Sequence, residues 1–219
     1  MKRTVDSFEK INEKNVVTNE NTSHVDMDLI FVLDKSGSMS DSVEDTIGGF
    51  NSFIRRERVK NPNTRVTLVL FNDEYEILYT RKPIADVEAL TGEEYFACGC
   101  TALLDAVGHT IVSFDKEVNN KVLFVITTDG LENASEKYSR ADVKNLIKNH
   151  DWEFLFIGAD IDSYAEASSI GIERERSANY EKCAAGFGAL FDSVSSFKES
   201  YEECEDDEEV GDDWKKGLF

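Results

Sequence analysis

The sequence predicts an α/β fold in which helices cover both faces of a doubly wound, mostly parallel six-stranded sheet. Two uninterrupted apolar runs, Leu29–Leu33 and Val122–Ile126, are typical of strands that are buried on both faces. From residue 26 onward such strands alternate with segments of helical periodicity, which favours parallel strands joined by helices. The turn Asn72-Asp73-Glu74 instead joins two neighbouring strands as a hairpin, so one strand should be antiparallel.

The individual elements follow from apolar periodicity and from turn and capping residues. A helix is expected where apolar residues recur every three or four positions, and its start is expected at a capping residue. The strands are expected at 28–34, 65–72, 75–80, 121–128, 152–158 and 171–176. The helices are expected through 43–54, over 102–118, after Ser139, from Ser163 to near Gly171, and from Asn179 onward.

Length and charge divide the chain into one domain and two polar ends. A chain of 219 residues can bury one sizeable core, which we place at 26–200. Residues 1–25 are polar and irregular and are expected to form a flexible N-terminal arm. Ten residues between 199 and 213 are acidic and none is basic, so 201–219 is predicted to be a disordered acidic tail.

Composition also limits the classes of function. The net charge is −20, and both the domain and the tail are acidic, which argues against a nucleic-acid partner. No run of about 20 apolar residues could span a membrane, and the first residues lack the apolar core of a signal peptide. We therefore expect a cytoplasmic protein. The cysteines lack the spacing of a zinc site and are expected to be reduced thiols: Cys98, Cys100, Cys183 and Cys204.

Oxygen-bearing side chains follow two of the predicted strands and precede one of the predicted helices. Asp34-x-Ser36-x-Ser38 comes directly after the first strand, where open α/β sheets place their ligand sites. Thr101 precedes the helix at 102–118, and Asp129 follows the strand at 121–128. Carboxylates and hydroxyls are hard ligands that suit Mg²⁺ or Mn²⁺ better than a soft metal. These residues are therefore candidate metal ligands.

This combination resembles the metal-ion-dependent adhesion site of von Willebrand factor A (vWA) domains. The resemblance covers roughly 26–200 and is greatest to small stand-alone bacterial and phage members. It implies a Rossmann-like sheet with an antiparallel edge strand. It also implies that Ser36, Ser38 and Thr101 bind the metal directly, while Asp34 and Asp129 act mainly through water. An Asp or Glu carboxylate from a partner protein would then fill the open position.

The resulting functional prediction is a non-catalytic, monomeric, metal-dependent protein-binding module. Small cytoplasmic relatives often work beside AAA+ ATPases or stress and tellurium-resistance components, which are the partner types that the resemblance suggests. One alternative is an acidic scaffold or decoy that acts through the tail. The other is a phosphatase-like hydrolase that uses Asp34, but such sites need a second acid two residues on, and Ser36 occupies that position.

Overall fold

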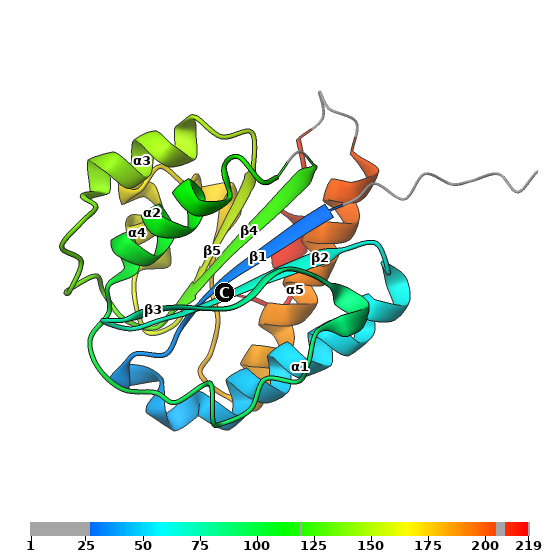
Figure 1. Ribbon diagram of the computed structural model, residues 1–219, viewed down its shortest axis with the longest axis horizontal. Coiled ribbons are helices and arrows are strands. Elements are labelled where there is room, and N and C mark those ends of the chain that lie inside the picture. The colour runs from blue at the N-terminus through cyan, green and yellow to red at the C-terminus, as the bar shows by residue number, and fades with distance from the viewer. Residues whose placement is uncertain (1–26, 119, 205–208, 219) are drawn as a thin grey trace, which may run out of the picture.

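A computed structural model describes residues 27–118, 120–204 and 209–218. The predicted arm at 1–25 lies outside these residues. The chain forms a six-stranded sheet in the order β3-β2-β1-β4-β5-β6, as predicted for the fold class (Figure 1). The strands are β1 (Met27–Asp34), β2 (Arg65–Phe71), β3 (Tyr75–Pro83), β4 (Lys121–Thr128), β5 (Glu153–Gly158) and β6 (Ser177–Asn179).

Strand β1 lies at the centre of the sheet and is buried along its whole length. It pairs in parallel with β2 on one side and with β4 on the other. Strand β3 pairs with β2 in the antiparallel direction and forms the edge, which confirms the predicted hairpin. Because β1 and β4 are parallel neighbours, their carboxyl ends lie side by side. This register brings the segments after Asp34 and Thr128 to one edge of the sheet.

Helices cover both faces of the sheet, so successive residues of β1 face two different cores. Leu29, Phe31 and Leu33 pack with α1 and α5, whereas Ile30 and Val32 pack with α2 and α3. The two helical layers are visible on opposite sides of the sheet in Figure 1. The helices are α1 (Val43–Lys60), α2 (Leu103–Phe114), α3 (Arg140–Lys148), α4 (Ser163–Ser169) and α5 (Ala184–Glu203).

The layer of α1 and α5 combines an aromatic core with a buried ion pair. The Phe31 ring lies edge-on to Phe50 and Phe53, at centroid distances of 5.5 and 5.4 Å. Beside this cluster, Glu57 of α1 and Lys198 of α5 are both fully buried, with Lys198 Nζ 3.3 Å from Glu57 Oε2. The Ser195 hydroxyl donates a hydrogen bond to Glu57 Oε1 at 2.5 Å. Apolar packing and this polar contact together join the two helices.

The C-terminal part of the chain differs from the sequence-based prediction. Helix α5 continues to Glu203, and beyond it Val210 and Trp214 are buried although the acids around them are exposed. The Trp214 indole N–H donates to the carbonyl of Glu175 at 3.1 Å, and its ring lies edge-on to Phe197 at 5.7 Å. The disordered tail predicted for 201–219 is therefore wrong for the described residues. The prediction rested on the acids and did not expect Val210 and Trp214 to pack on the domain itself.

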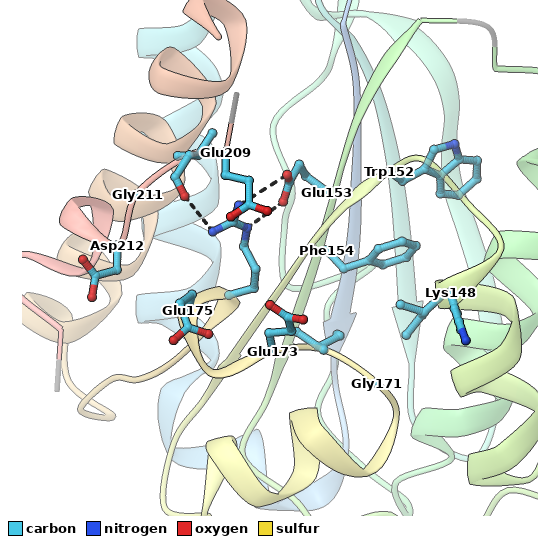
Figure 2. Close-up of a pocket in the computed structure, with 14 residues that line it drawn as sticks. Lys148, Trp152, Glu153, Phe154, Gly171, Glu173, Glu175, Glu209, Gly211 and Asp212 are labelled. Atoms are coloured by element: carbon cyan, nitrogen blue, oxygen red, sulfur yellow. Dashed lines mark hydrogen bonds and ion pairs between the residues drawn. The ribbon is translucent and has the colours of Figure 1, made fainter. Parts of the chain in front are cut away.

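An arginine fixes this C-terminal segment to the far end of the sheet. Arg176 pairs with Glu153 of β5, with Nε 2.6 Å from Oε2, and donates to the carbonyl of Val210 at 2.8 Å. Figure 2 shows Glu153 beside the segment of Glu209 and Gly211, and these residues line a cavity of about 660 Å³. Residues 209–218 are thus held against the domain by Phe197 of α5, which contacts Trp214, and by Arg176, which also pairs with Glu153 of β5.

Other sequence-based boundaries hold or shift by a few residues. Ser139 caps α3 in a capping box with Asp142, as predicted. The last strand lies at 177–179 and not at 171–176, and α5 begins at Ala184 and not at Asn179. Tyr180 is buried in the connector between them. Among the residues that the structure describes, no helix is both long and apolar enough to cross a membrane.

Candidate metal-ion site

The predicted ligand residues come together at the carboxyl ends of β1 and β4. Asp34 is the last residue of β1, and Asp129 directly follows β4. Ser36 is the N-cap residue of the 3₁₀ helix Gly37–Ser42, and Ser38 is the second residue of that helix. Thr101 lies two residues before α2. Three separate segments therefore converge on one place.

Asp34 is almost fully buried, and the protein surrounds its carboxylate with hydrogen-bond donors. Oδ1 accepts from the backbone N–H of Ser36 at 2.6 Å, and Oδ2 accepts from the Thr128 hydroxyl at 2.5 Å. The buried Tyr95 hydroxyl donates to the Asp34 carbonyl. Burial raises the pKa of Asp34 to about 6, although the hydrogen bonds from Thr128 and Ser36 lower it and Asp129 raises it slightly further. Asp34 thus holds the serine turn in place.

The two serines connect Asp34 to Asp129. Ser36 Oγ lies 3.1 Å from Ser38 Oγ, and the Ser38 hydroxyl donates to Asp129 Oδ1 at 2.5 Å. Ser36 is buried, whereas Ser38 is exposed to solvent. Four of the predicted ligands thus form one continuous chain of polar contacts.

Thr101 reaches the same place from the loop before α2. Its backbone N–H donates to Asn133 Oδ1 at 2.9 Å, and its carbonyl accepts from the Asn133 N–H at 3.0 Å. A Cβ at Gly130 would lie 2.7 Å from Thr101 Oγ1 and 3.5 Å from Ser38 Oγ. A glycine after Asp129 therefore lets the three segments approach each other closely.

Lys182 is a site residue that the sequence analysis missed. It lies in the connector between β6 and α5, at the same edge of the sheet. Its Nζ lies 2.6 Å from Asp129 Oδ2 and donates to the Ser38 carbonyl at 2.9 Å. Asp129 Oδ2 is buried and has no hydrogen-bond partner, so the contact with Lys182 is an ion pair without hydrogen-bond geometry. The signal that could have identified Lys182 in the sequence was its position shortly after the last strand, since Asp129 also follows a strand end.

The loop at 95–101 is held against the serine turn by backbone contacts. The Gly37 N–H donates to the carbonyl of Gly99 at 3.0 Å, and the Cys98 N–H donates to the carbonyl of Lys35 at 2.9 Å. Gly99 has a φ of +79°, and a Cβ there would lie 1.8 Å from Asp73 Oδ1, so only glycine fits. This loop also carries Phe96, whose exposed fraction is 68%.

The residues present fit a hard divalent cation. The site gathers three hydroxyls and two carboxylates, including one buried carboxylate oxygen with no hydrogen bond. Within 27–118, 120–204 and 209–218, no group of three or more His, Cys, Asp or Glu side chains could hold a metal. Any cation here would therefore depend on the hydroxyls as well as on the acids. Oxygen donors of this kind suit Mg²⁺ or Mn²⁺.

Comparison with solved structures finds proteins of the same fold. The similar solved structures include the pilus adhesin SpaC from Lactobacillus rhamnosus GG (TM-score 0.66, 11% identity, covering 78% of this chain and 30% of that one). They also include the vWF domain of the type V pili tip protein Mfa5 from Porphyromonas gingivalis (TM-score 0.61, 12% identity, covering 86% and 99%). A third is a von Willebrand factor type A structure from Catenulispora acidiphila (TM-score 0.61, 15% identity, covering 80% and 43%).

The TM-scores show a shared fold, and at these low identities the likeness shows the fold alone. The chain spans less than half the length of SpaC and of the Catenulispora acidiphila protein. No curated protein matches the chain in sequence. The model of the von Willebrand factor type A domain matches residues 28–187, which is most of the chain and includes all the candidate ligands. The chain therefore belongs to the von Willebrand factor type A family, whose domains commonly mediate protein–protein interactions.

Proposed function

We propose that this chain is a non-catalytic protein-binding module whose binding depends on a divalent cation. Mg²⁺, or Mn²⁺ in its place, would be held by Asp34, Ser36, Ser38, Thr101 and Asp129. The observation that carries the proposal is the convergence of these side chains, above all the chain of contacts from Ser36 through Ser38 to Asp129. The bound cation would supply an open position for an oxygen ligand from outside.

The observed contacts support different roles for the hydroxyls and the acids. Asp34 has both carboxylate oxygens engaged by Ser36 and Thr128, which suits a residue that orients the turn and acts on a cation through water. Asp129 orients Ser38 in a similar way through one oxygen. The three hydroxyls are then the direct protein ligands. Few negative charges would touch the cation, so a carboxylate from a partner is a favourable additional ligand.

The charge of the chain explains why binding would depend on the cation. At a net charge of −20, a site built on two acids repels an incoming carboxylate. A divalent cation reverses the local charge and turns repulsion into attraction. Phe96 and Leu131 stand exposed on the loops that carry Thr101 and Asp129, and they offer apolar contacts beside the open position. The proposed partner is thus a protein that presents an Asp or Glu next to apolar side chains.

The partner types and cellular setting remain part of the proposal. The proposed partner is an AAA+ ATPase or a stress or tellurium-resistance component, and the proposed setting is the cytoplasm, for a protein of bacterial or phage origin. Neither alternative function gains a supporting observation. The Asp34 carboxylate is buried and engaged by Ser36 and Thr128, and part of the acidic tail packs on the domain itself.

The test is a calorimetric titration of chelator-treated protein with Mg²⁺ and Mn²⁺. We expect one saturable site in the natural chain and loss of binding in Asp34→Ala and Thr101→Ala. Asp151→Ala is the matched control, because it removes an acid from an exposed position outside the site. Affinity in Asp34→Ala equal to that of the natural chain would overturn the metal assignment.

The partner is tested separately, by affinity capture from lysate in Mg²⁺ or in chelator. Proteins retained by the natural chain in Mg²⁺ should be lost in chelator and with Thr101→Ala, while Asp151→Ala retains them. A candidate identified in this way is then purified and titrated directly. Equal capture in Mg²⁺ and in chelator would show that binding does not use the cation.

A further inference from the structure

Lys182 contacts Asp129 and Ser38, two residues of the candidate site, through its ammonium group. Its side chain is only 18% exposed, and the Asp129 side chain that it faces is fully buried. The ammonium lies 2.6 Å from Asp129 Oδ2 and 2.9 Å from the carbonyl oxygen of Ser38. Asp160 Oδ2 is a third oxygen, 3.8 Å away. Holding a lysine side chain in this partly buried position costs rotamer entropy, and the contacts with these oxygens offset that cost.

The ammonium and a divalent cation would share the same carboxylate. Asp129 Oδ1 accepts the hydrogen bond of the Ser38 hydroxyl, while Oδ2 faces Lys182. A cation bound by the Ser38 hydroxyl therefore comes close to the ammonium. The cation and the Lys182 ammonium would then repel each other strongly, because water is partly excluded from the site. Occupation by the metal and occupation by Lys182 thus oppose each other.

The same contact stabilises the protein when no metal is present. Without a positive charge, Asp129 would be a buried carboxylate that repels the nearby carboxylate of Asp34. Burial of an unpaired carboxylate is costly, and a nearby ammonium offsets that cost. Lys182 is long and lies in a connector, so its side chain can leave the site without unfolding a helix or strand.

We propose that Lys182 is a tethered cation that occupies the metal-free site and that Mg²⁺ or Mn²⁺ must displace. The residue then sets the metal concentration at which the module becomes competent to bind its partner. This inference rests on the proposed metal site and adds to it a competitor that belongs to the chain itself.

The test compares the natural chain with Lys182→Met, which keeps the length of the side chain and removes its charge. We expect Lys182→Met to bind Mg²⁺ about tenfold more tightly in calorimetry, because the competing charge is gone. In chelator, the same variant should have a lower Tm than the natural chain, so Mg²⁺ should raise its Tm further. Lys182→Arg retains a cation and should keep the weaker affinity.

Lys60→Met is the matched control for net charge. Lys60 lies at the far end of α1 and pairs with exposed Glu199, so its loss should change the Mg²⁺ affinity by less than about twofold. If Lys182→Met is poorly folded by circular dichroism, Lys182→Gln takes its place. Equal or weaker Mg²⁺ affinity in the uncharged variant would overturn the competition and leave the metal site standing. Absence of Mg²⁺ and Mn²⁺ binding in every protein would overturn the metal site and the competition together.

Discussion

Burial of Asp34 determines the pH at which the site can accept a cation. Asp34 would act on the cation through water and attract it only when ionised, and burial has raised the pKa of Asp34 in the metal-free protein to about 6. Protons therefore compete with the metal below this pH. Because folding raises the pKa of Asp34, the ionised carboxylate is less favourable in the folded protein than in the unfolded chain. The metal-free protein should thus lose stability as the pH rises from the ordinary pKa of the carboxyl through about 6.

We predict that Mg²⁺ affinity is nearly constant above pH 7 and falls by up to about tenfold per pH unit below 6. Calorimetric titrations at pH 5, 6, 7 and 8 in buffers of equal ionic strength measure the effect. An ordinary, solvent-exposed aspartate would move the fall to below pH 4. Equal affinity at pH 5 and 7 would contradict the raised pKa.

The motif residues could be predicted from sequence because their spacing relative to strand ends defines them. Asp34, Ser36 and Ser38 are local, and Thr101 and Asp129 adjoin predicted elements. Lys182 was missed because the predicted last strand ended at 176, whereas β6 ends at Asn179, shortly before Lys182. Whether the five residues bind a metal stays a prediction.

At the scale of elements, α1 and α5 are joined by the buried pair of Glu57 and Lys198. Lys198 Nζ also lies 2.6 Å from Glu202 Oε1, one turn further along α5. Removal of one partner from a buried pair leaves the other charge without compensation. The pair should therefore be sensitive to single substitutions and tolerant of joint replacement.

We predict that Lys198→Met lowers the free energy of unfolding by about 3–5 kcal/mol, because Glu57 remains buried without a cation. Urea unfolding followed by circular dichroism measures it. The double variant Glu57→Leu/Lys198→Met should recover most of the loss. Mg²⁺ affinity should stay unchanged, since the pair lies outside the site. A single variant as stable as the natural chain would contradict a stabilising role for this buried pair.

The element boundaries that failed have a common physical cause. Strand β6 consists of Ser177, Ala178 and Asn179, which carry no apolar or β-branched pattern, and tertiary pairing with β5 makes it a strand. Tyr180 fits the helical periodicity of α5 but packs in the connector against Phe187, at 4.9 Å between ring centroids. Long apolar runs such as β1 and β4 were predictable because burial on both faces leaves a signal in every residue.

At the scale of the whole molecule, the C-terminal segment closes the edge of the domain opposite to the site. Lys121, at the start of β4, donates to the carbonyls of Tyr201 and Cys204 at 3.0 and 2.6 Å. Trp214 packs against Phe197 of α5 and donates a hydrogen bond to the Glu175 carbonyl. The acids alone predict an unfolded tail, but buried Val210 and Trp214 and the hydrogen bond from Arg176 to the Val210 carbonyl hold the segment on the domain.

We predict that Trp214→Ala lowers the free energy of unfolding by about 3–5 kcal/mol, as is usual for loss of a buried tryptophan. Thermal and urea unfolding measure the change. Asp212→Ala, at an exposed position two residues earlier, should have little effect. Mg²⁺ affinity should remain that of the natural chain. Unchanged stability in Trp214→Ala would mean that the segment packs without contributing to folding.

Among the candidate ligands, Ser38 is exposed, whereas Asp34, Ser36, Thr101 and Asp129 are buried. In the proposed site, ions would therefore enter and leave past Ser38, on the side where a partner would dock. Association would then be ordered: the ion first, the partner second. A docked partner closes that route, so the ion should exchange no faster than the partner dissociates. Chelator added to a preformed complex would act on the timescale of partner release, although it strips the free module at once.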